Sequence, residues 1–172
     1  MEIRRAEPAD VDEIMLLVKK AVPLMHQAGN YQWTDDYPNP EIFEQDISLG
    51  QLWLSTIDEK IAGVIAITTN QSPEYVNAGW DITEKAIVPH RLAVDPDRRG
   101  SGIAQALMNH AEQIAKENNI SILRVDTNSQ NKATQGLFTK LGYEYSGTIS
   151  LGKRPELKYY CYEKRIQGGR PF

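Results

Sequence analysis

Residues 93–104 read AVDPDRRGSGIA, and this stretch decides how the chain is organised. It leaves an apolar run at Val94, turns at Asp95-Pro96 and then carries Gly-Ser-Gly at 100–102. An apolar series at helical spacing follows between residues 103 and 114. The pattern predicts a strand that leads through a glycine-rich loop into a helix, which is the layout of a phosphate-binding turn. A tight turn that binds no ligand is the alternative.

Composition is typical of a globular protein with an ordinary core. The 172 residues are 41% hydrophobic and predict one domain over 1–172, with a loose tail from about 167 to 172. A formal net charge of −4 argues against a nucleic-acid partner, because nucleic-acid binding selects a basic surplus. The single cysteine, Cys161, excludes an internal disulfide, and three scattered histidines predict no metal site.

The N-terminal segment and the hydropathy bear on location. Residues 1–10, MEIRRAEPAD, lack the apolar core of a signal peptide. No apolar run approaches the roughly 18 residues that cross a bilayer. We therefore expect no membrane partner and a cytoplasmic location.

Hydrophobic periodicity predicts the element order β-α-α-β-β-β-α-β-α-β-β along the whole chain. The first helix should start at 7–10 and end near Pro23, because proline lacks the amide that a helix interior needs. Pro89 indicates a bulge, an edge or an irregular start in its strand. The expected elements are a strand at 1–6, helices starting near 7 and 39, a hairpin within 51–70, a strand at 86–94, a helix at about 102–118, a strand at 120–127, a helix at 131–141 and two strands within 143–166.

Four features then occur in a fixed order. Leu92-Ala93-Val94 ends a strand before Asp95-Pro96, and Arg99-x-x-Gly102-x-Ala104 follows as a loop. Asn128 and Asn131 come after the next strand, and residues 137–143, LFTKLGY, close the last helix. In this order and spacing, the set resembles the GNAT superfamily of N-acetyltransferases over nearly all of the chain.

The resemblance implies an α+β fold in three layers. Its mixed, mostly antiparallel and strongly twisted sheet would have six to seven strands, about four flanking helices and a splayed central strand pair. It also implies acetyl-CoA as the cofactor, with the pyrophosphate on the loop amides and the pantetheine arm paired to the strand backbone. The implied cofactor-binding residues are Leu92, Ala93, Val94, Arg98, Arg99, Gly100, Ser101, Gly102, Ile103, Ala104, Asn128, Asn131 and Phe138.

The groups that would move protons do not follow the family's pattern. Many members carry a tyrosine on the last helix that protonates the leaving thiolate, and Phe138 stands at that position here. Another group, such as Tyr143, Tyr145 or water, would then protonate the thiolate. Core packing is the alternative role of Tyr143. Candidates for the base are His90, for its intrinsic pKa, and Glu84 or Asp81 acting through water.

In this family the acceptor site draws on the connection between the first two helices and on the final hairpin loop. These are residues 26–40 and 150–156 here. Asp126 ends a strand from which polar groups reach the cleft, and a turn cap is its alternative role. Aromatic and acidic side chains in the first connection predict a wall for a cationic amine, or packing onto the core: Tyr31, Trp33, Asp35, Asp36 and Tyr37.

Three functions are compatible with these residues. The leading hypothesis is an N-acetyltransferase that moves the acetyl group of acetyl-CoA to the primary amine of a small molecule or an amino acid derivative. The second is acetylation of a protein N-terminus or lysine. The third is a non-catalytic acetyl-CoA sensor, which Phe138 keeps open. A homodimer is compatible with each, since dimers are common in the family.

Overall fold

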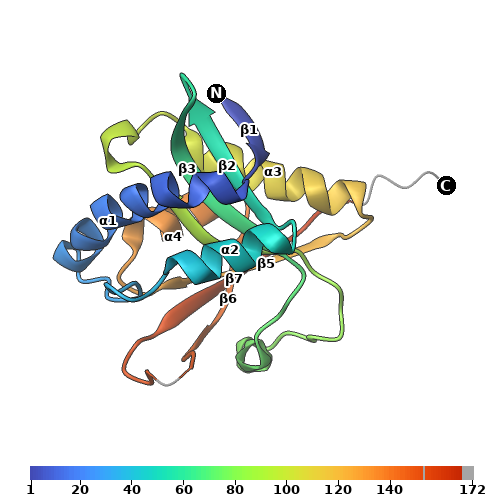
Figure 1. The fold of residues 1–172 in the computed structure, drawn as a ribbon. Helices are drawn as coiled ribbons and strands as arrows, with labels where there is room; N and C mark the ends of the chain where they lie inside the picture. The colour runs from blue at the N-terminus through green and yellow to red at the C-terminus, as the bar shows by residue number, and fades with distance from the viewer. Residues whose placement is uncertain (153, 168–172) are drawn as a thin grey trace. The chain divides into compact units, whose positions relative to one another are not determined.

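The computed structural model describes residues 1–152 and 154–167 (Figure 1). Its contacts divide the chain into two compact units. The first comprises residues 1–68 and 89–110, and the second comprises 69–88 together with the described residues from 111 onward. Residues 168–172 of the predicted tail lie outside the described residues.

Four strands form the sheet of the first unit, in the order β1-β2-β3-β4. β1 pairs antiparallel with β2, and β2 pairs antiparallel with β3. The β2–β3 turn holds Asp58 and Glu59 at φ 52° and 65°, the left-handed pair of a two-residue hairpin, so the predicted hairpin is confirmed. The strands are β1 Glu2–Arg5, β2 Leu52–Ile57, β3 Lys60–Thr68 and β4 Val88–Val94.

Two helices pack onto this sheet. α1, Val11–Gln27, packs against β3, and α2, Pro40–Ser48, packs against β2 and α1 (Figure 1). α2 begins as predicted, because the Asn39 side chain accepts a hydrogen bond from the Ile42 amide at 3.0 Å. Their apolar faces and the inner face of the sheet build one core, which includes Ile14, Val18, Phe43, Leu52, Leu54 and Val64.

The predicted end of the first helix near Pro23 is wrong. α1 continues to Gln27 with Pro23 inside it. A proline at this position leaves the carbonyl of Lys19 without its helical donor. Both residues are exposed, so water can hydrogen-bond that carbonyl and the helix continues.

Three strands form the sheet of the second unit, in the order β5-β7-β6, and both pairings are antiparallel. The strand predicted at 120–127 is confirmed as β5, which is buried along its length except for half-buried Asp126, as in a strand with both faces covered. Gly147 of β6 lies against Ala78, where an added Cβ would come within 3.1 Å of the Ala78 Cα. The elements are η2 Pro73–Ala78, β5 Ile122–Asn128, α4 Lys132–Lys140, β6 Glu144–Ile149 and β7 Tyr159–Arg165, with α3, Ile103–Glu117, running from the first unit into the second.

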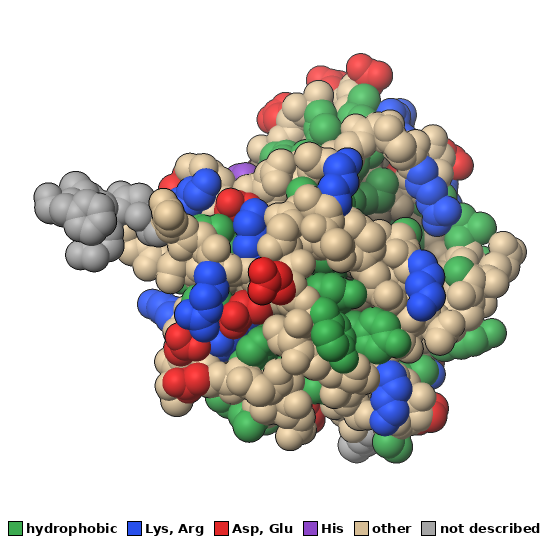
Figure 2. Space-filling model, turned by 180° about the vertical axis from the view of Figure 1, so that it is seen from behind, with side chains coloured by type: hydrophobic (Ala, Val, Ile, Leu, Met, Phe, Trp, Pro, Cys, Tyr) green, Lys and Arg blue, Asp and Glu red, His purple; other side chains and the backbone are tan. Residues whose placement is uncertain are grey.

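The predicted α+β class is confirmed, with four α-helices among the described residues and seven strands divided between two sheets. Pro89 lies in β4, which stands last in the order of its sheet, so the edge is the one of the three expected alternatives that the sheet order supports. None of the helices in the described residues is both long and apolar enough to span a membrane. On the face drawn in Figure 2, Lys and Arg side chains lie among Asp and Glu side chains.

Candidate active site

The loop after β4 begins with a braced turn. Asp95 accepts a hydrogen bond from the Asp97 amide at 3.0 Å, which caps a 3₁₀ turn at Pro96–Arg98. Lys20 of α1 donates to Asp95 at 3.2 Å and to Asp97 at 2.9 Å. The exit from β4 is therefore tied to the neighbouring helix before the glycines begin.

The glycines of this loop adopt backbone conformations that other residues rarely take. Gly100 and Gly102 have φ of 81° and 74°. The backbone amides of residues 99–104 donate to no acceptor in the described part of the chain, and the first helical bond runs from the Ala106 amide to the Gly102 carbonyl at 3.0 Å. Arg98 is half-buried and Arg99 is exposed beside them. Free amides at the positive end of a helix, next to arginine, form an anion-binding surface.

The strand that precedes the loop carries an irregularity. Arg91 has φ 51°, which is left-handed backbone inside β4. Ala93 is buried in the core of the first unit, and Leu92 and Val94 beside it are half-buried. The side chain of Ala93 therefore packs in the core of the first unit. The backbone of Leu92 and Val94 lies in the last strand of the sheet.

The predicted acceptor connection divides into packed and exposed aromatic rings. Trp33 is only 5% exposed and belongs to the core, and its carbonyl accepts from His26 Nε2 at 2.7 Å. Tyr31 is 50% exposed, and its ring lies tilted against the His26 ring with the centroids 5.0 Å apart. Tyr37 is exposed and accepts a hydrogen bond from Arg91 at 3.4 Å. The Trp33 side chain thus has the packing role, while the rings of Tyr31 and Tyr37 and the carboxylates of 35–36 are exposed.

In the second unit, Asp126 is held by a buried tyrosine. Tyr75 is fully buried and its hydroxyl donates to Asp126 Oδ2. Burial, and then the Asp126 charge, raise the pKa of Tyr75 well above its usual value, so this hydroxyl stays protonated. Burial, and then Asp126, also raise the pKa of the Cys161 thiol to about 12. Cys161 is therefore a buried, protonated thiol, and Asp126 supplies the negative charge beside Tyr75 and Cys161.

These features match one known family. A family model described as "Acetyltransferase (GNAT) family" covers residues 19–143, which is more than half of the chain. The chain belongs to the GNAT acetyltransferase family.

Relatives agree in fold and in class of activity. A curated relative from Bacillus subtilis (strain 168), described as the uncharacterized N-acetyltransferase YesJ, is 25% identical over 161 residues, covering 91% of this chain and 86% of that protein. The crystal structure of a GNAT-family acetyltransferase from Streptococcus agalactiae 2603 is 28% identical with a TM-score of 0.83, covering 96% of this chain and 95% of that one. A putative acetyltransferase from Staphylococcus aureus Mu50 is 27% identical with a TM-score of 0.74, covering 97% and 100%. This GNAT protein is accordingly an acyl-CoA-dependent acetyltransferase.

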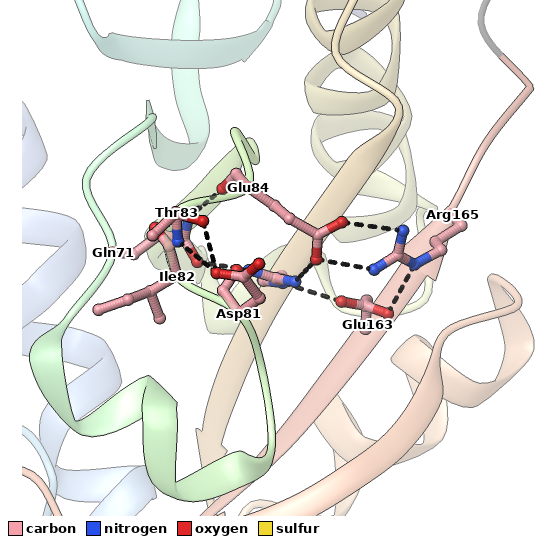
Figure 3. Close-up of polar contacts among 8 residues, drawn as sticks. Gln71, Asp81, Ile82, Thr83, Glu84, Glu163 and Arg165 are labelled. Atoms are coloured by element: carbon pink, nitrogen blue, oxygen red, sulfur yellow. Dashed lines mark hydrogen bonds and ion pairs between the residues drawn. The ribbon is translucent and has the colours of Figure 1, made fainter.

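The predicted base Glu84 takes part in a network around a buried arginine of β5 (Figure 3). Arg124 is 0% exposed. Its Nε donates to Glu163 at 2.8 Å, and its Nη2 donates to Glu84 at 2.9 Å. Its Nη1 donates to the Gln71 side chain at 2.8 Å and to the Asp81 carbonyl at 2.9 Å. The guanidinium therefore joins β5 and β7 to the connection that runs from 69 to 88.

The network changes what Glu84 can do. Arg165 donates to Glu84 at 3.0 Å, and this contact, with that of Arg124, holds the pKa of the Glu84 carboxyl below its usual value. Hydrogen bonds from Thr83 likewise lower the pKa of Asp81. A general base near neutral pH needs a pKa close to that pH, so both carboxylates are poorly suited to the predicted role. His90 is half-buried in β4, and its role as base stays a prediction.

The asparagines after β5 have structural partners. The Asn128 side chain accepts from the Gln130 amide at 2.9 Å, and Asn131 caps α4 by accepting from the Thr134 amide at 3.1 Å. Asn131 therefore has a structural role at the start of α4. A contact of either residue with the cofactor stays a prediction, because an amide retains its nitrogen donors after accepting through oxygen.

The aromatic residues predicted near the thiolate form a packed cluster. Phe138 is 3% exposed, with its ring centroid 5.6 Å from those of Tyr143 and Tyr162. The Tyr143 hydroxyl is buried without a hydrogen-bond partner in the described residues, and burial raises its pKa. Tyr145 is 57% exposed and shares a hydrogen bond with Thr148. The geometry of Tyr143 supports the packing alternative, and its role as acid stays a prediction.

Sequence reasoning missed Arg124 and Tyr75. One signal for Arg124 was present, since a lone arginine interrupts the apolar run ISILRVDT at 120–127. Inside a covered strand such a charge requires carboxylate partners, but the pattern does not say which ones. Tyr75 lay in a connection without periodicity, where no local signal marks a buried hydroxyl.

We predict that Gly102→Glu abolishes acetyl-CoA binding while the fold is retained. The new carboxylate would lie among the free amides, where it competes with the anion and repels it. Calorimetric titration with acetyl-CoA measures the loss. Gly50→Glu is the matched control, because Gly50 also has a left-handed backbone (φ 68°) and open space around it. Unchanged affinity in the Gly102 variant would remove this loop from the cofactor site.

We predict that Glu84→Gln keeps its turnover but loses stability in a pH-dependent way. The lowered pKa of Glu84 means that the carboxylate stabilises the fold above its unfolded-state pKa of about 4.3, and that this contribution disappears as the pH falls through the lower folded-state value. The difference in urea midpoint between wild type and variant should be largest at neutral pH and shrink below about pH 4. Glu156→Gln, at a 63% exposed side chain, is the control. Loss of kcat at unchanged stability would instead identify Glu84 as the base.

Proposed function

We propose that this acetyltransferase moves the acetyl group of acetyl-CoA to the primary amine of a small molecule or an amino acid derivative. The observation that carries the proposal is the row of free amides at 99–104, which opens α3 in a chain of the GNAT family. Bound acetyl-CoA supplies an activated thioester carbonyl. The ammonium first loses one proton to solvent or to a base, and the amine nitrogen then forms a bond to the acetyl carbon as the carbon–sulfur bond breaks. The nitrogen loses a second proton, and the CoA thiolate takes up one proton to leave as the thiol.

The residues of the loop fit the cofactor's pyrophosphate. A phosphate needs several converging N–H donors and positive charge, and the amides of 99–104 with Arg98 and Arg99 offer both. Glycine at 100 and 102 lets a ligand approach the backbone closely, because no Cβ stands in the way. The proposal assigns this loop to the pyrophosphate.

The backbone of β4 is assigned to the pantetheine arm and to the thioester. β4 is an edge strand, so an extended arm can pair with the backbone of Leu92 and Val94 as an added strand does. The thioester oxygen gains negative charge during transfer and needs an N–H donor in place beforehand. We assign the Leu92 amide as the donor to the thioester oxygen. This amide directly follows the left-handed residue Arg91.

A cationic amine is the acceptor that the polar residues favour. In the first unit, the exposed rings of Tyr31 and Tyr37 accompany the exposed carboxylates of 35–36, and ammonium groups bind to aromatic faces and to carboxylates. In the second unit, Asp126 presents a half-buried carboxylate that the Tyr75 hydroxyl holds in one orientation. We assign Asp126 to the acceptor ammonium. A cytoplasmic location and a homodimer are part of the proposal.

The first experiment is calorimetric titration with acetyl-CoA, with CoA and ATP as controls, followed by amine-dependent thiol release. Saturable binding near one acetyl-CoA per chain, and thiol release with small primary amines, would support the proposal. Thiol release with peptides but not with free amines would instead identify a protein acetyltransferase. Absence of binding by the folded protein would overturn the assignment of the loop.

We predict that Asp126→Asn raises KM for the amine while the affinity for acetyl-CoA is unchanged. The variant removes the charge that attracts the ammonium but keeps the size of the side chain. KM should rise by roughly tenfold or more, because a hydrogen bond to a charged group contributes about 1.5–3 kcal/mol. Steady-state kinetics at saturating acetyl-CoA measure the change. Asp12→Asn, at an exposed carboxylate of α1, is the control, and an unchanged KM in the Asp126 variant would exclude Asp126 from the acceptor site.

A further inference from the structure

Arg91 has a backbone conformation that its position in a strand does not explain. The described chain has three other non-glycine residues at positive φ, and they lie in the β2–β3 turn (Asp58, Glu59) or just after α3 (Asn119). Arg91 alone among these four lies inside a strand. A left-handed backbone brings the Cβ atom close to the neighbouring carbonyl, and glycine would avoid this cost. Arginine at this position indicates that its side chain is needed.

That side chain is held by a buried carboxylate of α2. Arg91 Nε donates to Asp46 Oδ2 at 2.7 Å, and Arg91 Nη2 donates to Asp46 Oδ1 at 2.7 Å. The Asp46 side chain is 4% exposed and that of Arg91 is 17% exposed. Gln51 completes the shell by donating to Asp46 Oδ1 at 2.9 Å. Two short parallel bonds fix the plane of the guanidinium, which a lysine could not do.

The same guanidinium also contacts the acceptor connection. Arg91 Nη1 donates to the Tyr37 hydroxyl at 3.4 Å. Arg91 therefore joins α2, β4 and the connection before α2, all within the first unit.

We propose that Asp46 is a positioning residue for acetyl transfer. By holding Arg91 in the left-handed conformation, it orients the peptide group between Arg91 and Leu92 and so aims the Leu92 amide. Through Tyr37, the same ion pair links that amide to the connection assigned to the amine. The inference rests on the proposed function, which assigns the Leu92 amide to the thioester oxygen.

The physical basis is the rotation of one peptide plane. The direction of the Leu92 N–H is set by the dihedral angles of Arg91, and an extended residue would turn it through a large angle. Once the bidentate contact is lost, only the longer 3.4 Å hydrogen bond to Tyr37 opposes relaxation toward the extended conformation that arginine prefers. Transfer should then suffer more than binding, because a donor to a developing charge acts mainly in the transition state.

The first arm of the test needs no ligand. In isotope-labelled protein, the Cα and Cβ chemical shifts of Arg91 report its backbone conformation. Asp46→Asn, which has nearly the same shape without the charge, should move these shifts toward extended values. Arg91→Lys is the second variant and leaves Asp46 with a cationic partner, so the buried carboxylate does not lose its counter-charge. Left-handed backbone shifts that persist at residue 91 in the folded variants would overturn the proposal.

The second arm is kinetic. Asp46→Asn should lower kcat by roughly tenfold to a hundredfold, because a displacement of about 1 Å at a reacting group can cost about a hundredfold. The affinity for acetyl-CoA should fall by a smaller factor than kcat, because a donor to a developing charge acts mainly in the transition state. The Asp46→Asn/Arg91→Lys double variant should be no worse than the worse single variant, because both changes break one contact. Additive losses, or a wild-type kcat in the folded single variants, would overturn the proposal.

Asp10→Asn is the matched control. Asp10 forms a second bidentate pair in the same unit, with Arg4 at 2.8 and 2.9 Å, away from β4. An equal loss of kcat in this control would show that any lost ion pair slows the enzyme, which contradicts a positioning role. If the wild type transfers acetyl to no amine, the proposed function fails, while the chemical shifts of Arg91 still decide whether Asp46 sets its backbone.

Discussion

The second unit depends on one buried cation. Arg124 lies fully buried in β5, where removing a guanidinium from water is costly unless carboxylates and carbonyls surround it. Glu84, Glu163, Gln71 and the Asp81 carbonyl meet that requirement, and they come from the connection before β4 and from β7. Losing one of these partners destabilises the unit, because the charge of Arg124 stays buried with fewer acceptors around it. The hydrogen bonds of Arg124 thus hold the connection at 69–88 against β5.

The first unit also contains an arginine–carboxylate pair, and this pair lies at a strained backbone position. The pair of half-buried Arg91 with buried Asp46 is bidentate, but Arg91 has a left-handed backbone that costs about 1–2 kcal/mol in a residue with a Cβ. Strain of this kind persists only where the surroundings over-determine the conformation. It lies in the strand whose backbone precedes the free amides of 99–104. Binding by backbone amides requires that the main chain be held, and side chains such as Asp46 and Lys20 hold it.

Local patterns predicted the elements that local chemistry controls. The loop at 93–104, the hairpin turn at 58–59 and the cap at Asn39 each follow from residues within a few positions of one another. The expected helix end at Pro23 failed because a proline breaks a helix only where its lost hydrogen bond cannot be replaced, and solvent replaces it here. Residue type and order suggest Glu84 as a base, but they carry no information on its contacts with Arg124 and Arg165, which lie 40 and 81 residues away in the chain.

By itself, the sequence determined the α+β class, the family and the glycine-rich loop that opens α3, because these depend on periodicity, spacing and backbone permissiveness near each position. The tertiary structure alone decided which polar groups are paired. Asp46 meets Arg91 across 45 residues, Tyr75 meets Asp126 across 51, and Arg124 meets Glu84 across 40. The energy of a charge depends on burial and on partners a few ångströms away, and neither quantity is encoded in the residues beside it.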